Sequence, residues 1–539
     1  MLGKSMPAEL VVTYLRGLEL TEVLGFCAQL LRLIDSGSKP EQVDAALEEV
    51  FQEGVWKRIR SLTAGGDRRL VAPHVLLVLL KHAARLSGDC RLPGVASGNV
   101  VAAMLGTADD LERLDGVDSE AVIGTGPPGV IEREIVATHH FHSEVDVQHM
   151  IAKFVRRWKQ LPAELVDDPR VVNLDSTFEE AVGVSIDEFV AVGMALYTAS
   201  IMRQPVIRRD HLSGLRLRNG AAERVLGLVM RGTAELRAWA RSIESVPTWE
   251  FSHIEQFPVV DCGNEMVVIR PRLVLQRFFG WLPFFDLANG LGVDRPAKKR
   301  VDAVRSCLGH LGEIYVRETL EQQSRRHGLR LFNEEQIRAA LNPTGGRRTC
   351  DITVDDGRRW AVFEVTSSQL NRESVAGTSA ERLDDVLSRL IGKVEQLDQT
   401  IDALRRRESD LTGLPVGGRR RYFPVLVLTE GFPVNPITLT ALRQRANEAQ
   451  LLRGNDIAEL EVVDGVELEI LEGADFGEPT VLDALDLKQQ AALYRSNMRD
   501  FLLRERHCRS ATPDRVAELA GIAFEIAMAA VRSPGDSIP

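Results

Sequence analysis

The sequence contains few cysteines, and none of them is spaced for a metal or redox motif. Its six cysteines lie far apart, with no Cys-x-x-Cys pair. Zinc ribbons need such pairs, so this class of site is excluded. Disulfide frameworks are typical of short secreted chains, and none is expected in a chain of 539 residues.

Long hydrophobic runs are also missing. The longest apolar run in the first half, VAPHVLLVLL at 71–80, is about half the length of a membrane span and contains Pro73 and His74. The N-terminal stretch MLGKSMPAELVV has no signal-peptide core. We therefore expect a cytoplasmic, reduced protein with no membrane partner.

Two further absences bear on the chemistry. No Gly-x-x-x-x-Gly-Lys-Ser/Thr motif occurs, which disfavours nucleotide hydrolysis on a phosphate-binding loop. Lysine is scarce relative to arginine, and Lys393 is the only lysine between Lys299 and Lys488. Each lysine in this region is therefore informative.

The composition is that of an ordinary globular protein. Hydrophobic residues make up 44% of the chain and charged residues 27%, and the length predicts two to four domains. The net charge of -11 argues against a general nucleic-acid coat. Contact with nucleic acid would therefore require a local basic patch.

Hydrophobic spacing predicts a mixed fold class, with a predominantly α-helical N-terminal region followed by a C-terminal α/β domain. Residues 1–130 are predicted to form a helical domain. Residues 131–298 are predicted to be mainly helical, with a β-hairpin near 257–269. Residues 299–475 carry the α/β pattern, and 476–539 form C-terminal helices with a frayed tail.

Within the α/β segment we expect a helix, a short strand, a hairpin, a long helix, a strand and a further helix. A second hairpin is predicted near 459–472, where ELEVVDGVELEILEG contains an Asp-Gly turn. The stretch GTGPPGVI at 124–131 is a predicted linker.

The first of these hairpins, in TCDITVDDGRRWAVFEVTSS, carries two acids. With Asp356 and Gly357 as its loop, Asp351 pairs with Val362, and Glu364 lies diagonal to Asp351 at about 7 Å between Cβ atoms. Side chains alternate along a strand, so both acids share one face. The opposite, apolar face carries Cys350, Ile352, Val354, Ala361, Phe363 and Val365.

These two acids have two interpretations. They can be solvated groups on the outer face of a half-buried hairpin, or they can be metal ligands. Glu364 lies in a strand apolar enough to be central, where an unpaired charge is costly. Two carboxylates at this spacing can share one Mg²⁺ or Mn²⁺ ion, since hard cations prefer oxygen ligands.

These residues and this order of elements resemble the restriction-endonuclease-like, or PD-(D/E)XK, nuclease superfamily over about residues 300–430. Asp351 matches the Asp of the motif, and Glu364 matches the acid of its Glu-x-Lys. Glu313, in GHLGEIYVRETL, matches the acid on the preceding helix. The resemblance implies that Glu313, Asp351 and Glu364 hold Mg²⁺ or Mn²⁺ and catalyse phosphodiester hydrolysis.

The sequence departs from the superfamily at Thr366, which stands where the catalytic lysine is expected. That lysine helps to activate water and stabilises developing negative charge, whereas threonine can only hydrogen-bond. Lys393, at the margin of the apolar stripe of the long helix, is the candidate for a relocated catalytic cation. Alternatively Lys393 extends along the helix margin into solvent, or Arg389 or Arg372 supplies the charge.

Arginines cluster before the hairpin and on both sides of a Gly/Pro-containing loop. Such clustering in an acidic chain favours a phosphate-binding rim, although the ends of helices also attract cations. The candidate nucleic-acid-binding residues are Arg347, Arg348, Arg405, Arg406, Arg407, Arg419, Arg420 and Arg421.

A histidine-rich stretch, THHFHSEVDVQHM, offers a weaker candidate site. A zinc site is conceivable there, but no His-Glu-x-x-His or comparable spacing occurs, so surface or internally hydrogen-bonded histidines are preferred. The residues concerned are His139, His140, His142 and His149.

The leading hypothesis is a metal-dependent endo- or exonuclease that hydrolyses DNA phosphodiester bonds, which the resemblance places in restriction, repair or anti-phage defence. The alternative is a nuclease-like fold that no longer cleaves and serves as a nucleic-acid-binding or protein-interaction scaffold. The helical N-terminal region is expected to contact a protein partner or a second copy of the chain.

Overall fold

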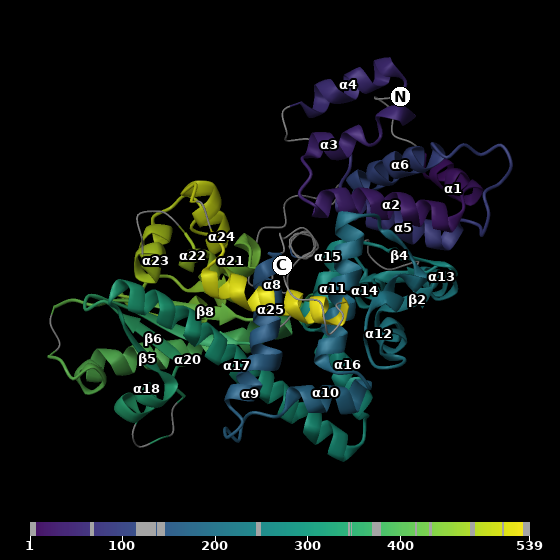
Figure 1. The fold of residues 1–539 in the computed structure, drawn as a ribbon. Coiled ribbons are helices and arrows are strands. Elements are labelled where there is room, and N and C mark those ends of the chain that lie inside the picture. Colours follow the sequence, from purple (N-terminus) through teal and green to yellow (C-terminus); the bar gives the residue numbers. More distant parts are fainter. Residues whose placement is uncertain are drawn as a thin grey trace. The chain divides into compact units, whose positions relative to one another are not determined.

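The computed structural model describes most of the chain and shows a mixture of helices and two sheets (Figure 1). The residues it describes are 7–64, 69–114, 136, 146–243, 249–342, 345, 348–368, 379–415, 418–430, 434–474, 480–508 and 511–531. The mixed α/β class expected from the sequence is confirmed. Arg347, Arg372, His139, His140, His142 and the predicted linker at 124–131 lie outside the described residues.

The chain forms two compact units. Unit 1 comprises Met1–Glu120, Asp175–Gly292 and Ala523–Pro539, and unit 2 comprises Ala121–Leu174 and Val293–Ile522. Each unit is discontinuous in sequence, whereas the sequence analysis divided the chain into four contiguous segments.

Unit 1 is mainly helical and contains a small sheet of strand order β1-β4-β3-β2. Strands Val259–Asp261 (β3) and Glu265–Val268 (β4) pair antiparallel and turn at Gly263, whose φ of +89° suits glycine. They confirm the hairpin expected near 257–269. The other strands are Val206–Arg208 (β1) and Met230–Gly232 (β2).

The helices of unit 1 include several whose apolar spacing is visible in the sequence. They are Ala8–Gly17 (α1), Leu20–Asp35 (α2), Pro40–Ala45 (α3), Glu53–Thr63 (α4), Pro73–Leu86 (α5), Asn99–Leu114 (α6), Leu174–Val182 (α10), Ile186–Met202 (α11), Ala221–Val229 (α12), Thr233–Ser242 (α13), Ser252–Gln256 (α14), Pro271–Phe279 (α15) and Leu282–Leu291 (α16), with short 3-10 helices at Glu48–Val50 and Arg209–Gly214.

Unit 2 contains a five-stranded sheet of order β5-β6-β7-β8-β9. Arg330–Asn333 (β5), Ile352–Asp355 (β6) and Arg359–Thr366 (β7) form an antiparallel meander. Arg421–Leu428 (β8) and Glu461–Asp464 (β9) then add parallel to β7. Parallel neighbours require crossover connections, and helices Ala380–Thr412 (α20) and Pro436–Glu448 (α21) supply them.

Helices cover both faces of this sheet. Glu334–Leu341 (α18), α20 and α21 share one buried apolar cluster with the sheet. On the other face, Arg295–His327 (α17), Gly465–Glu472 (α22) and Val481–Gln489 (α23) share a second cluster with it. Burial on both faces explains why β7 and β8 read as nearly continuous apolar runs.

The remaining helices of this part of the chain are shorter, apart from the last. They are Val147–Val155 (α8), Arg156–Gln160 (η2), Leu161–Glu164 (α9), Met498–Asp500 (α24), Phe501–Glu505 (η4) and Asp514–Val531 (α25).

The β6–β7 hairpin is present, but its register differs from the predicted one. Residues 356–358 lie outside the strands, and Asp355 pairs with Trp360. The Asp356 side chain accepts hydrogen bonds from the Arg358 and Arg359 amides, which stabilises a longer turn than the two-residue loop. The resulting shift of two residues keeps each side chain of the strands on its predicted face.

Two further details of the hairpin correct the sequence analysis. Cys350 packs in the cluster with Trp360, not with Ile352, because it precedes β6 and does not follow the strand's alternation. Both faces of the hairpin are buried, and Glu364 is only 1% exposed. The interpretation of Glu364 as a solvated acid is therefore wrong.

The second predicted hairpin, near 459–472, is also wrong. Strand β9 ends at Asp464, and helix α22 begins at the next residue. The Asp464 carboxylate accepts a hydrogen bond from the Val466 amide at 2.8 Å. Asp464 is therefore the N-cap of a helix, whereas the sequence predicted a turn residue.

Among the described helices, no single one is both long and apolar enough to cross a membrane. Only the bent pair α10 and α11, with 73° between them, meets that condition when the two are taken together.

Candidate functional site

Two acids meet near the carboxyl end of β7. The Asp351 amide, just before β6, donates to the carbonyl of Phe363, the residue that pairs with Ile352, at 3.1 Å. The Val365 amide in turn donates to Asp351 Oδ2 at 2.7 Å. The charge of Glu364 acts on the Asp351 carboxyl, so the two acids are neighbours. The predicted pairing of Asp351 with Val362 is not formed, because Val362 pairs with Thr353.

Helix α20 adds a cation to these acids. Lys393 Nζ lies 2.6 Å from Glu364 Oε1, and the lysine side chain keeps 34% of its surface exposed. The other oxygen, Glu364 Oε2, is buried and has no hydrogen-bond partner among the described residues. Glu364 thus has one oxygen bonded to lysine and one that is buried without a hydrogen bond. Burying that second oxygen costs free energy unless a further ligand binds it.

The electrostatics of the cluster favour an additional positive charge. Burial, together with the charges of Glu364 and Glu313, raises the pKa of Asp351 to about 8. Burial also raises the pKa of Glu364 to about 7, although the charge and hydrogen bond of Lys393 oppose this. Near neutral pH the two carboxyl groups therefore bind protons in the metal-free protein. A divalent cation would displace these protons when it binds.

Lys393 remains protonated in this setting. Burial by itself would lower the pKa of the ammonium group, but the attraction of Glu364 and of Asp351 outweighs burial and raises it above its ordinary value. The group is therefore a permanent cation at the edge of the acid pair.

Glu313 lies on α17 near these acids, without joining them in a ready ligand set. Its charge acts on Asp351, Glu364 and Lys393, and 38% of its side chain is exposed. Within the described part of the chain, no three His, Cys, Asp or Glu side chains are arranged to hold one metal ion. Glu313 therefore does not complete a three-ligand set within that part of the chain.

Thr366 follows Glu364 on the same face of β7, but its hydroxyl is engaged elsewhere. Its Oγ1 lies 3.0 Å from Ser368 Oγ and accepts the Ser368 amide at 3.3 Å. The threonine thus stabilises the end of the strand, and among the described residues its hydroxyl bonds to neither Glu364 nor Lys393.

The two large arginine clusters lie at the other end of the sheet. Arg421 pairs with Arg359 at the start of β7, five residues from Glu364, which corresponds to about 17 Å along the strand. Arg405 lies 12 residues beyond Lys393 on α20, a rise of about 18 Å. These arginines do not surround the acids, so they do not form a rim around this site.

Most of these arginines are held by carboxylates. The ion pairs join Arg405 to Asp456, Arg407 to Asp410, Arg420 to Glu408 and Arg421 to Asp486. Arg348, Arg406 and Arg419 are exposed and make no ion pair with another described residue. Arg348 lies only three residues before Asp351, so it is the arginine of this set nearest to the acids in sequence.

Comparison of the chain with protein-family models, with curated proteins and with solved structures gives no match. The geometry of the site therefore carries the functional argument.

The structure also brings in residues that sequence reasoning missed. His310, on α17, lies with Nδ1 3.5 Å from Glu313 Oε2 and Nε2 3.3 Å from Asp168 Oδ2. Asp168 is held in turn by Arg170 at 2.9 Å. No local pattern could have found Asp168, because it precedes His310 by 142 residues.

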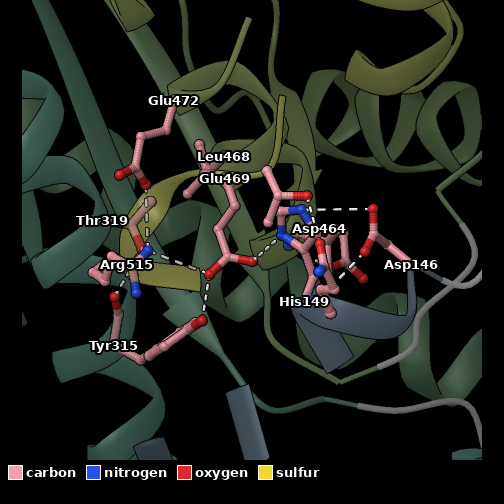
Figure 2. Close-up of polar contacts among 12 residues, drawn as sticks. Asp146, His149, Tyr315, Thr319, Asp464, Leu468, Glu469, Glu472 and Arg515 are labelled. Atoms are coloured by element: carbon pink, nitrogen blue, oxygen red, sulfur yellow. Dashed lines mark hydrogen bonds and ion pairs between the residues drawn. The ribbon is translucent and has the colours of Figure 1, made fainter. Parts of the chain in front are cut away.

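In a second polar cluster, shown in Figure 2, the side chains bond to one another. His149 is 1% exposed, with Nδ1 2.5 Å from Glu469 Oε2 and Nε2 3.5 Å from Asp146 Oδ2. Glu469 also accepts a hydrogen bond from the Tyr315 hydroxyl. The preferred interpretation of His149 as an internally hydrogen-bonded histidine is thus confirmed.

The C-terminal helix is attached to the same cluster. Arg515 donates to Thr319 Oγ1 at 3.0 Å and to the carboxylates of Glu469 and Glu472 at 3.3 Å each. Figure 2 shows His149, Tyr315 and Arg515 meeting Glu469 from different elements, and Arg515 also reaching Thr319 and Glu472. The cluster joins α8, α17, α22 and α25, so we assign it a structural role.

Proposed function

We propose that unit 2 is a divalent-metal-dependent nuclease that hydrolyses DNA phosphodiester bonds. The observation that carries the proposal is the meeting of Asp351, Glu364 and Lys393 at one end of the sheet. Two carboxylates, of which Glu364 is buried, and one cation are the groups needed to hold a metal ion and to neutralise a phosphate.

The metal itself fits the donor set. Asp351 and Glu364 offer hard oxygen ligands, and the buried, unsatisfied Glu364 Oε2 would gain a partner from the ion. Mg²⁺ keeps several waters and often takes only one or two carboxylates, so two direct ligands are sufficient. Glu313 would hold one of these waters.

The chemistry divides between the ion and the chain. When bound, Mg²⁺ or Mn²⁺ lowers the pKa of its water and neutralises charge on the phosphate. Lys393 holds Glu364 Oε1, which leaves Oε2 for the ion. An ammonium group has three N–H donors, so two remain for oxygens of the phosphate as negative charge develops.

The order of elements supports the same proposal. Helix α17, the antiparallel meander β5–β6–β7, helix α20 and the parallel strand β8 follow the order that the resemblance implies. In that order Asp351 directly precedes β6 and Glu364 lies on the neighbouring β7, and the charge of Glu313 on α17 acts on both.

A second candidate function is DNA binding without cleavage. Thr366 bonds to Ser368 and supplies no charge, and Glu364 is already neutralised in part by Lys393. These two observations favour a site that has kept the fold and lost the reaction.

One experiment separates the two candidates. The full chain would be incubated with Mg²⁺ or Mn²⁺ and with linear, circular and single-stranded DNA, beside the near-isosteric variants Asp351→Asn and Glu364→Gln. Glu395→Ala, an exposed acid on α20, is the matched control. Cleavage lost in both site variants and kept in the control supports the nuclease.

Equal cleavage by the wild type and both site variants would overturn the nuclease assignment. DNA binding with no cleavage under any metal condition would favour the second candidate.

A further inference from the structure

We infer that His310 and Asp168 are positioning residues that orient Glu313 toward the metal held by Asp351 and Glu364. The inference rests on the metal site of the proposed function and extends it to two residues that the sequence did not suggest. It starts from the chain of contacts Arg170–Asp168–His310–Glu313, which ends beside the acid pair.

The first step is the fixed position of the imidazole. His310 has 13% of its side chain exposed, and Asp168 has 18%. Asp168 receives two hydrogen bonds from the Arg170 guanidinium, at 3.1 and 2.9 Å, and one from the Arg170 amide at 2.9 Å. Because Asp168 is held in place, its contact with Nε2 fixes the orientation of the His310 ring. Carboxylates orient metal-binding histidines in the same way.

The second step is the anchoring of the Asp168 loop on α17. The Val172 amide donates to Cys307 Sγ at 3.4 Å, one helical turn before His310. The loop therefore contacts α17 at two successive turns, and Asp168 can hold His310 without relying on a long flexible connection.

The third step is the direction of the remaining ring nitrogen. Nδ1 faces Glu313 at 3.5 Å, which is long for a hydrogen bond. Such contacts in ligand-free sites often shorten when the ligand binds. Glu313 is also the more exposed partner, at 38%, so it has the freedom to turn toward a metal-bound water.

A positioning role predicts which substitutions of His310 are tolerated. In His310→Asn, the amide nitrogen stands near the place of Nδ1 and can still donate to Glu313. In His310→Gln, the longer side chain places its nitrogen near the place of Nε2, which keeps the contact to Asp168 and loses the one to Glu313. The pair therefore tests the Glu313 contact while keeping a polar side chain of similar size.

The test is Mn²⁺ binding to the full chain, measured by titration calorimetry. Loss of a supporting residue around a metal typically weakens affinity by about 10-fold to 100-fold. We expect a loss of about that size in His310→Gln and Asp168→Asn, and a smaller loss in His310→Asn, which keeps the contact to Glu313 and loses the one to Asp168. His327→Gln, 17 residues further along α17 and thus about 25 Å away, is the control and should bind normally.

Thermal unfolding of each variant checks that the fold is retained. Normal Mn²⁺ affinity in both His310→Gln and Asp168→Asn would overturn the inference, and so would an equal loss in His310→Asn. If the variants show the expected pattern of Mn²⁺ affinities but the wild type cleaves no DNA, the nuclease proposal is overturned and the inference is supported. A wild-type protein that binds no Mn²⁺ would overturn both.

Discussion

Lys393 Nζ lies 2.6 Å from Glu364 Oε1, so the long helix α20 places a cation against the carboxylate of strand β7. This lysine lies 29 residues downstream of Glu364, whereas the resemblance implies a lysine at the position of Thr366. The predictions below test whether this contact is catalytic, what it does to stability, and which other charges matter.

Lys393→Ala should reduce DNA cleavage by about 10²-fold to 10³-fold, the usual effect of removing one donor that stabilises developing charge. Initial rates at saturating Mg²⁺ measure the effect. Arg389→Ala, one turn earlier on the same helix and exposed, should cleave normally. Unchanged cleavage in Lys393→Ala would remove this lysine from the mechanism.

Thr366→Lys should restore part of the cleavage in a Lys393→Ala background. Thr366 shares a face of β7 with Glu364, and its half-buried position lets a longer side chain extend toward solvent. Thr366→Gln, with similar length and no charge, is the matched control and should restore nothing. Equal rates in the two double variants would show that charge at this position is irrelevant.

The stability of the metal-free protein should fall as the pH rises from about 4 to about 8. Ordinary carboxyls titrate near pH 4 in the unfolded chain. In the folded protein the pKa is about 7 for Glu364 and about 8 for Asp351. The folded state therefore binds more protons than the unfolded state in this window, so the free energy of unfolding decreases with rising pH.

For Glu364 alone the decrease is on the order of 3 kcal/mol. Urea denaturation at several pH values measures it, and Glu364→Gln should flatten the curve. Added Mg²⁺ should stabilise the protein more at about pH 8 than at about pH 5, because protons compete with the ion. If the free energy of unfolding depends on pH identically in wild type and Glu364→Gln, Glu364 does not titrate with a raised pKa in the folded protein.

His149→Ala should destabilise the protein by about 3–5 kcal/mol, since it leaves the buried Glu469 carboxylate short of a partner. Tyr315→Phe should cost about 1–2 kcal/mol through loss of the hydroxyl donor. Arg325→Ala removes an exposed ion pair with Glu321 and should change stability by less than about 1 kcal/mol. Reduced cleavage by fully folded His149→Ala would contradict a purely structural role.

The arginines should divide into structural and binding groups. Arg420 is paired with the buried Glu408 at 2.7 Å, so Arg420→Ala should mainly lower stability. Arg406 and Arg419 are exposed, and if both contact phosphates their joint replacement by alanine should reduce the salt dependence of DNA binding by a slope of about 2. Binding measured at several salt concentrations decides this, and an unchanged slope would exclude the two residues.

Local patterns in the sequence were sufficient for several features. The hairpin near 257–269 and the assignment of strand residues to faces followed from alternation and from Gly turns, which act over a few residues. The position of Lys393 at the margin of an apolar helical stripe allowed either contact with the acids or extension into solvent, and the structure shows the contact with Glu364.

Other features depended on contacts that local patterns do not contain. Asp356 capped a longer turn and shifted the register by two residues, and Asp464 capped a helix where Asp-Gly suggested a hairpin. Both errors arise because aspartate serves turns and helix starts equally well, and the neighbouring structure selects between them.

The sequence by itself determined that two acids lie within one apolar, turn-containing stretch, because residue type and spacing suffice for that. Only the tertiary structure decided that Val362 pairs with Thr353 and not with Asp351, that Lys393 bonds to Glu364, and that the arginine clusters lie at the far end of the sheet. The physical reason is that register, helix crossover and charge pairing depend on burial of surfaces contributed by distant parts of the chain.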